Sequence, residues 1–176
     1  MDEIQFKLGE CLADDLYLIR YVDVYINNLR LMDLVCQAMN RQHKVQKSAD
    51  FWGYVGLHIE SNLFHTDSFP GILADPIGRS EYWKPVLTCT CGIDLCSSIA
   101  ARIEILGDFI IWHEVLDPWL GPLPAELKAD REFENYIPGD FSGIGPYLFR
   151  GKQYIGAWNA FKGWVMEWKR WNKFSV

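Results

Sequence analysis

The clearest pattern in the chain is a helical repeat of apolar residues near its C-terminal end. Over residues 153–172 large apolar side chains recur at steps of three and four, which places them on one helix face. The spacing therefore predicts an amphipathic helix. Trp164 and Trp171 lie on the flank of that face, either at the rim of the core or as an exposed aromatic pair beside basic residues. The residues of the apolar face are Tyr154, Trp158, Phe161, Val165 and Trp168.

Two kinds of element are predicted in the first part of the chain. Apolar and polar residues alternate over 4–8, and residues 16–26 are rich in β-branched and aromatic side chains, so both segments are expected to be strands. Asn27 and Asn28 indicate a turn. The apolar residues that follow have helical spacing and predict a short amphipathic helix over 29–41. Residues 54–59 fit both a strand and a helix, and their assignment stays open.

A hairpin is the clearest β-structure in the middle of the chain. Residues 99–106 and 109–115 alternate like two strands, and Gly107 and Asp108 between them suit a tight turn. Residues 85–91 predict another strand before the hairpin. With 176 residues, one domain over 1–176 is expected. We predict an α+β fold in which an antiparallel sheet packs against the C-terminal helix and the shorter helix.

Composition points to an ordinary globular protein. Hydrophobic residues make up 49% and charged residues 23% of the chain. Residues 1–7 do not resemble a secretory signal, and no apolar run approaches the roughly 20 residues that span a bilayer. The five cysteines are an odd number, which argues against a secreted disulfide framework. We therefore expect a cytoplasmic protein that does not bind membranes.

Charge is distributed unevenly along the chain. The net charge of −6 disfavours general binding to nucleic acid. Residues 104–140 hold nine acidic and two basic residues, whereas 150–173 hold six basic residues and one acidic residue. Either the two segments neutralise each other in the fold, or the acidic segment attracts a basic protein partner. Candidate partner-binding residues are Glu114, Asp117, Trp119, Trp164 and Trp171, because exposed acids steer a basic partner and Trp is favoured at interface hot spots.

The most unusual local chemistry is a cluster of three cysteines. Cys89, Cys91 and Cys96 fall within eight residues, and Gly92 follows the second. Three thiolates suit zinc, with His113 or His65 as a candidate fourth ligand. The same cluster also suits a reactive thiol or a disulfide, or three small buried side chains around a turn. The pattern does not choose among these alternatives.

The cysteine region also resembles a group of uncharacterised bacterial proteins. Their shared pattern is an apolar strand, C-x-C-G-x-x-x-C, an alternating strand with R-I, and then V-x-W. Residues 85–96, 101–104 and 110–112 resemble it, and 22–27, 54–57 and 145–149 are similar as well. This chain departs after Cys96, where Ser97 and Ser98 replace an aromatic residue, and the pattern has no histidine matching His113. The resemblance implies a bacterial source and a shared fold, but no reaction.

No complete catalytic signature accompanies these features. The chain lacks G-x-S-x-G, Walker, Rossmann and H-E-x-x-H patterns. An acid in the segment 117–145 is compatible with an enzyme, but no substrate is selected, so enzymatic activity stays open. The leading hypothesis is a non-catalytic cytoplasmic protein-binding module, for example a toxin-neutralising immunity protein. The alternative is a zinc-binding or thiol-redox protein centred on Cys89, Cys91 and Cys96.

Overall fold

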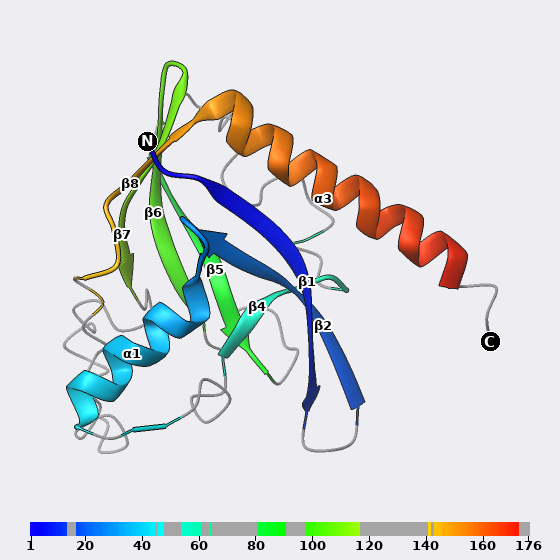
Figure 1. Cartoon of the computed structure of the whole chain (residues 1–176), viewed down its shortest axis with the longest axis horizontal. Coiled ribbons are helices and arrows are strands. Elements are labelled where there is room, and N and C mark those ends of the chain that lie inside the picture. The colour runs from blue at the N-terminus through cyan, green and yellow to red at the C-terminus, as the bar shows by residue number, and fades with distance from the viewer. Residues whose placement is uncertain are drawn as a thin grey trace, which may run out of the picture.

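The fold is a single α+β domain, as the hydrophobic pattern predicts. It consists of a curled antiparallel sheet, a long C-terminal helix and one shorter helix (Figure 1). None of the helices in the described ranges is long and apolar enough to cross a membrane. The computed structural model describes residues 1–13, 17–44, 46–47, 54–60, 64, 81–90, 98–116, 141 and 143–172.

The strands follow one another in chain order. The sheet order is β1-β2-β4-β5-β6-β7-β8, each strand is antiparallel to the next, and β3 pairs separately with β2. The topology is therefore a meander, in which neighbours in sequence are neighbours in space. The elements are β1 (Ile4–Ala13), β2 (Tyr17–Ile26), β3 (Leu29–Arg30), α1 (Leu31–His43), β4 (Tyr54–His58), β5 (Glu81–Cys89), β6 (Ser98–Leu106), β7 (Phe109–Leu116), β8 (Tyr147–Arg150) and α3 (Gly151–Asn172).

The sheet curls until its two ends meet. The Asp2 backbone N–H donates a hydrogen bond to the Leu148 carbonyl oxygen at 2.8 Å. In return, the Leu148 N–H donates to the Asp2 carboxylate at 2.7 Å. Because Asp2 lies just before β1 and Leu148 lies in β8, these bonds join the first and last strands. β8 was not anticipated from the sequence, because four residues are too few to show a period.

Both predicted turns are confirmed. Gly107 links β6 to β7 with a φ of 57°. Asn27 and Asn28 link β2 to β3 with φ values of 52° and 65°, which Asn tolerates better than most residues. The pairing of Leu29 and Arg30 as β3 explains why α1 begins two residues later than predicted. Residues 54–58 form a strand, so the alternation of apolar residues was the correct guide and the helical spacing was not.

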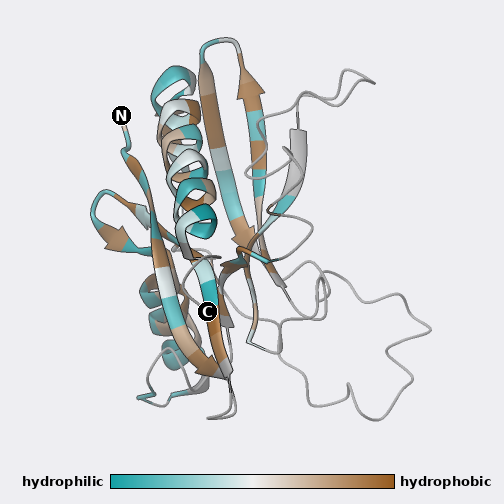
Figure 2. Ribbon diagram, turned by 90° about the vertical axis from the view of Figure 1, so that its right-hand side faces the viewer, coloured by the Kyte–Doolittle hydropathy of each residue, from teal (hydrophilic) through white to brown (hydrophobic). Residues whose placement is uncertain are grey.

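One hydrophobic core holds the helices to the sheet. Helix α3 runs between β1 and the β6–β7 hairpin, and α1 lies apart from it, at the lower left of Figure 1 (Figures 1 and 2). The predicted apolar face of α3 is buried except for Trp168, which is half-buried. Its Trp158 ring packs edge-on against Phe6 of β1, with the centroids 5.2 Å apart. Leu31 and Val35 of α1 join the same core, so sheet and helices form one unit.

Candidate functional site

The cysteine cluster lies mostly outside the described residues. Cys91 and Cys96 are not in the described ranges, and Cys89 is the half-buried last residue of β5. Among the side chains that are described, no group of three His, Cys, Asp or Glu residues is arranged to hold a metal ion. Zinc binding, thiol chemistry and a purely structural role for the cluster therefore all stay predictions.

The structure places His113 away from Cys89. Thr88, next to Cys89 at the end of β5, pairs with Ser98 of β6. His113 is the unpaired residue of a β-bulge in β7, beside the pair of Glu114 with Arg102. These two β6 positions are four residues apart, about 13 Å along a strand. His113 Nε2 lies 2.7 Å from a carboxylate oxygen of Glu104, so its nearest partner is an acid on the neighbouring strand.

A different histidine lies next to Cys89. Nε2 of His58 donates a hydrogen bond to the Cys89 carbonyl oxygen at 3.1 Å. His58 belongs to β4, and the contact depends on the pairing of β4 with β5. No local sequence pattern signals this contact, because the two residues are 31 positions apart and the spacing of the β4 segment also fits a helix. His65, the other candidate ligand, lies outside the described residues.

The predicted partner-binding residues fall into three groups. Asp117 and Trp119 lie outside the described ranges. Glu114 is exposed, and Arg102 Nε donates to its carboxylate at 2.8 Å. Trp164 and Trp171 are both on α3 and are 49% and 73% exposed. Their exposure corresponds to the aromatic-pair interpretation rather than to the rim of the core.

Two described acids of the β6–β7 hairpin have partners within the hairpin itself. Glu104 is in contact with His113, and Glu114 forms an ion pair with Arg102. Asp108 is exposed in the turn. The basic end of α3 makes a separate contact, since Lys169 Nζ donates to the Ile59 carbonyl at 2.8 Å and to Glu60 at 3.0 Å. Glu114 and Lys169 are therefore each paired with a residue outside both charged segments.

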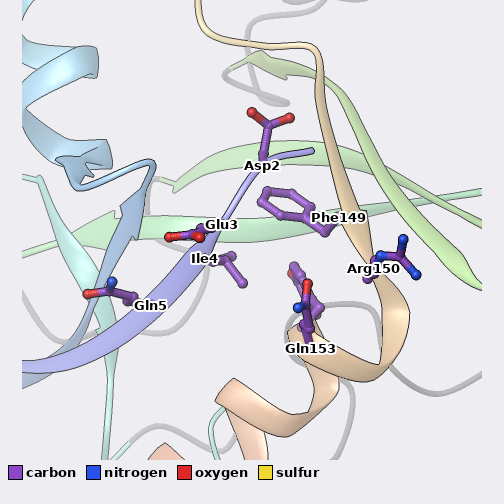
Figure 3. A pocket seen from close by; sticks show the side chains of 8 residues that line it. Asp2, Glu3, Ile4, Gln5, Phe149, Arg150 and Gln153 are labelled. Atoms are coloured by element: carbon purple, nitrogen blue, oxygen red, sulfur yellow. The ribbon is translucent and has the colours of Figure 1, made fainter.

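Two hollows follow β1 along its contact with α3. The first, of about 230 Å³, lies between residues 2–5 and the junction of β8 with α3, where Gln153 faces Ile4 (Figure 3). The second, of about 280 Å³, lies between residues 6–8 and the middle of α3, where it is lined by Phe161 and Trp164. Because residues 2–5 and 6–8 are consecutive, the hollows form one line. We name this line the β1–α3 seam.

The acid in the first hollow is already satisfied. Asn27 Nδ2 donates to one Asp2 carboxylate oxygen at 2.7 Å, and the Leu148 N–H donates to the other. Burial works to raise the pKa of Asp2, but these hydrogen bonds outweigh it and hold the pKa below its usual value. Asp2 is thus an ionised group that closes the sheet, which is the opposite of a general acid with a raised pKa.

A second polar group lies on the outer face of β2. Arg30 Nε donates to both carboxylate oxygens of Asp23, at 2.7 and 2.9 Å, and Arg30 Nη2 donates to the Tyr21 hydroxyl at 2.8 Å. Asp23 is only 6% exposed, and burial raises its pKa despite the guanidinium. The three side chains satisfy one another and tie β2 to the start of α1. Their arrangement stabilises the fold and presents no open chemical group.

Relatives do not add to this description. No protein-family model, curated protein or solved structure matches the chain.

Proposed function

We propose that the chain is a non-catalytic protein-binding module of the cytoplasm, in the class that includes toxin-neutralising immunity proteins. The observation that supports this proposal is the exposed apolar surface of α3. Trp164 and Trp171 are 49% and 73% exposed. Large apolar side chains held in water on a rigid helix are the residues that gain most free energy when a partner covers them.

The position of Trp164 strengthens the argument. Trp164 and Trp171 are seven residues apart, so they project from the same side of α3. Trp164 also lines the second hollow of the seam. An exposed aromatic ring beside a concave apolar surface is a common arrangement at interface hot spots, because the partner can desolvate the ring completely.

The polar groups in the described ranges also favour binding over catalysis. Asp2 is held ionised by two hydrogen bonds, and Asp23 is enclosed with Arg30. His113 is held by Glu104. Each of these groups is engaged in a contact that supports the fold, which disfavours a catalytic role for it.

The partner is proposed to be a basic protein. The net charge of −6 produces an attraction that acts beyond the contact surface and accelerates association. Salt screens such long-range attraction, with a Debye length of about 8 Å at physiological ionic strength. The association rate should therefore fall as salt is added, while the dissociation rate changes little.

The test is affinity capture from a bacterial lysate with the full-length chain and three variants. Trp164→Ala and Trp171→Ala shorten the two exposed aromatic side chains. Met166→Ala is the matched control, because Met166 is equally exposed but lies two positions from Trp164 and so on the opposite flank of α3. A true partner is retained by the wild-type chain and by Met166→Ala and is depleted with Trp164→Ala.

The captured protein is then purified and titrated against the same chains by calorimetry. The proposal expects Trp164→Ala to weaken binding about tenfold or more, as is typical for an aromatic hot spot. Repeated capture of no protein, or equal affinity of all four chains, would contradict the proposal. Circular dichroism of each variant checks that the loss does not come from unfolding.

A further inference from the structure

In the described part of the chain, no strand pairs with the edge of β1 that faces the seam. The Glu3 carbonyl accepts a hydrogen bond from the Asn27 N–H at 2.9 Å, so the backbone groups of Glu3 point towards β2. Backbone groups alternate in direction along a strand, so those of Phe6, Leu8 and Glu10 point away from β2. Among the described strands β1 has a neighbour on one side only. A strand edge of this kind is a template for another strand.

The contact with β8 shows that this edge accepts a backbone partner. Asp2, like Phe6 and Leu8, is an even-numbered position, so its backbone groups point to the same side of the strand. Its N–H donates to the Leu148 carbonyl. β8 ends at Arg150, where α3 begins at Gly151. Beyond that point the edge continues without β8. The open part is thus a continuation of the junction that closes the sheet.

Helix α3 leaves room beside this edge. Gln153 lines the first hollow and Trp164 lines the second, so the flank of α3 that carries them follows β1. Between them on the same flank are Ala157 and Ala160, whose side chains are small. An added strand would lie about 4.8 Å from β1, in the region where the two hollows lie beneath this flank.

We propose that the β1–α3 seam binds an extended segment of the partner protein as an added strand of the sheet. The segment hydrogen-bonds to the outward backbone groups of Phe6, Leu8 and Glu10, and its inward side chains enter the 280 Å³ hollow beside Trp164. Those side chains are apolar, because the hollow is lined by Phe6, Leu8 and Phe161. The inference rests on the proposed function and gives the chemistry of its partner.

The positive charge of Lys7 favours an acidic residue in the bound segment, between its two inward side chains. Lys7 lies between Phe6 and Leu8 on the opposite face of β1, is exposed, and holds its ammonium 3.9 Å from the centre of the Tyr25 ring. Opposite charges on neighbouring strands attract each other. The segment therefore carries Asp or Glu opposite Lys7, flanked by apolar residues. This single acidic residue interacts with Lys7 only at short range, so the partner protein can still carry a net positive charge.

A second copy of this chain fits the seam poorly. Antiparallel pairing of two β1 strands about Lys7 places the two lysines opposite each other, and pairing about Glu10 does the same for two acids. Pairing about Leu8 places Glu10 opposite Phe6 of the other copy, in the apolar hollow. Inward charges on edge strands are a common protection against self-association. A different chain is therefore the occupant.

The test uses the full-length chain and two synthetic peptides that differ at one position. One peptide has the core Thr-Val-Thr-Val-Glu-Val-Thr and the other has Thr-Val-Thr-Val-Lys-Val-Thr, so that in antiparallel pairing valines lie opposite Phe6, Leu8 and Glu10. Both are titrated by NMR and calorimetry into the wild-type chain, Glu10→Pro and Glu10→Ala. Both Glu10 variants lose the ion pair with Arg20, but only proline also removes the outward N–H. Where Glu10→Pro does not fold, hydrogen exchange at the Leu8 and Glu10 amides of the wild-type chain, with and without peptide, decides instead.

The expected result has three parts. The glutamate peptide binds about fivefold more tightly than the lysine peptide, and Lys7→Gln removes that preference. Binding slows hydrogen exchange at the Leu8 and Glu10 amides. Glu10→Pro binds about tenfold or more weakly than Glu10→Ala, because a peptide carbonyl loses its donor.

Three results would overturn the proposal. They are no saturable binding of either peptide below about 1 mM, equal affinity of Glu10→Pro and Glu10→Ala, or a dimer of the free chain that Glu10→Pro abolishes. Lysate capture separates this proposal from the general binding function. A partner lost with Trp164→Ala but kept with Glu10→Pro leaves the binding function standing and rejects strand addition. A partner kept with both variants rejects both.

Discussion

The indole N–H of Trp112 donates a hydrogen bond to the hydroxyl of Tyr154 at 3.1 Å, with both side chains fully buried. Trp112 lies in β7 and Tyr154 lies in the first turn of α3. The bond therefore ties the start of the helix to the far end of the sheet. Since the direction of α3 determines the width of the β1–α3 seam, this internal contact also shapes the surface that we propose for partner binding.

Replacing Tyr154 with Phe should destabilise the fold. The variant keeps the ring but removes the acceptor of the Trp112 N–H, which then stays buried without a partner. The free energy of unfolding should fall by about 1–3 kcal/mol. Urea denaturation followed by tryptophan fluorescence measures the change. An unchanged midpoint and slope would show that the bond contributes nothing.

The same hydroxyl makes the stability depend on alkaline pH. Burial raises the pKa of Tyr154 well above its usual value of 10.0, and the hydrogen bond from Trp112 offsets only part of this. The folded state thus keeps the neutral phenol while the unfolded chain loses its proton. The contribution is complete below pH 10 and declines as the pH rises above that value.

Urea denaturation of the wild-type chain and of Tyr154→Phe from about pH 8 to about pH 11 tests this dependence. The wild-type chain should lose stability more steeply than the variant above pH 10. The comparison removes the contribution of lysines and other tyrosines, which both chains share. Parallel curves would mean that Tyr154 ionises equally well in the folded and unfolded states.

The elements that sequence patterns predict well are those with a long local period. α3 and the β6–β7 hairpin follow directly from apolar spacing, because each buries one regular face. β8 has four residues and becomes a strand only by pairing with β7. The closure at Asp2 and Leu148 joins residues 146 positions apart, which no local pattern reports.

The features of the candidate site also depend on contacts that no local sequence pattern reports. The exposure of Trp164 and Trp171 was one of two alternatives, because a helix flank can lie at the core or in water. The open edge of β1 is recognised from the strand order and from which backbone groups point away from β2. Both are known only once the pairing of β1 with β2 is known. His58 reaches Cys89 only because β4 pairs with β5. In each case a functional feature depends on contacts between distant segments.

Replacing glycines with alanine should lower stability where the backbone is closely packed and should not do so where the glycine faces open space. A Cβ on Gly56 would lie 1.7 Å from the Val22 carbonyl oxygen, and one on Gly9 would lie 2.2 Å from the Tyr21 ring. Gly163, in α3, has no atom within 4 Å of the same position. Gly9→Ala should cost about 1–3 kcal/mol, because the buried ring has to shift. Gly56→Ala should cost more, since a strand backbone has to move.

Gly163→Ala is the control and should stabilise the chain. Alanine lowers the entropy lost when a helix forms, which contributes about 0.5–1 kcal/mol at an exposed helical position. Thermal unfolding of the three variants gives the order directly. A stable Gly56→Ala protein would mean that β2 and β4 are further apart than the structure indicates.

Two tryptophans on α3 should separate stability from binding. Trp158 is buried and packs edge-on against Phe6 and Phe64, with ring centroids 5.2 and 5.7 Å apart. Trp158→Ala should therefore cost about 3–5 kcal/mol. Trp164 is half in water and its ring lies beside Phe161 at the edge of the core, so Trp164→Ala should cost less than about 1 kcal/mol.

Denaturation and partner binding are measured on the same two variants. Trp164→Ala should stay folded and lose its partner, because the exposed ring gains its free energy only when the partner covers it. At temperatures where Trp158→Ala is still folded, it should keep measurable affinity, since its side chain does not reach the surface. If Trp164→Ala instead unfolds as readily as Trp158→Ala, its ring belongs to the core, and the binding surface on α3 loses its main support.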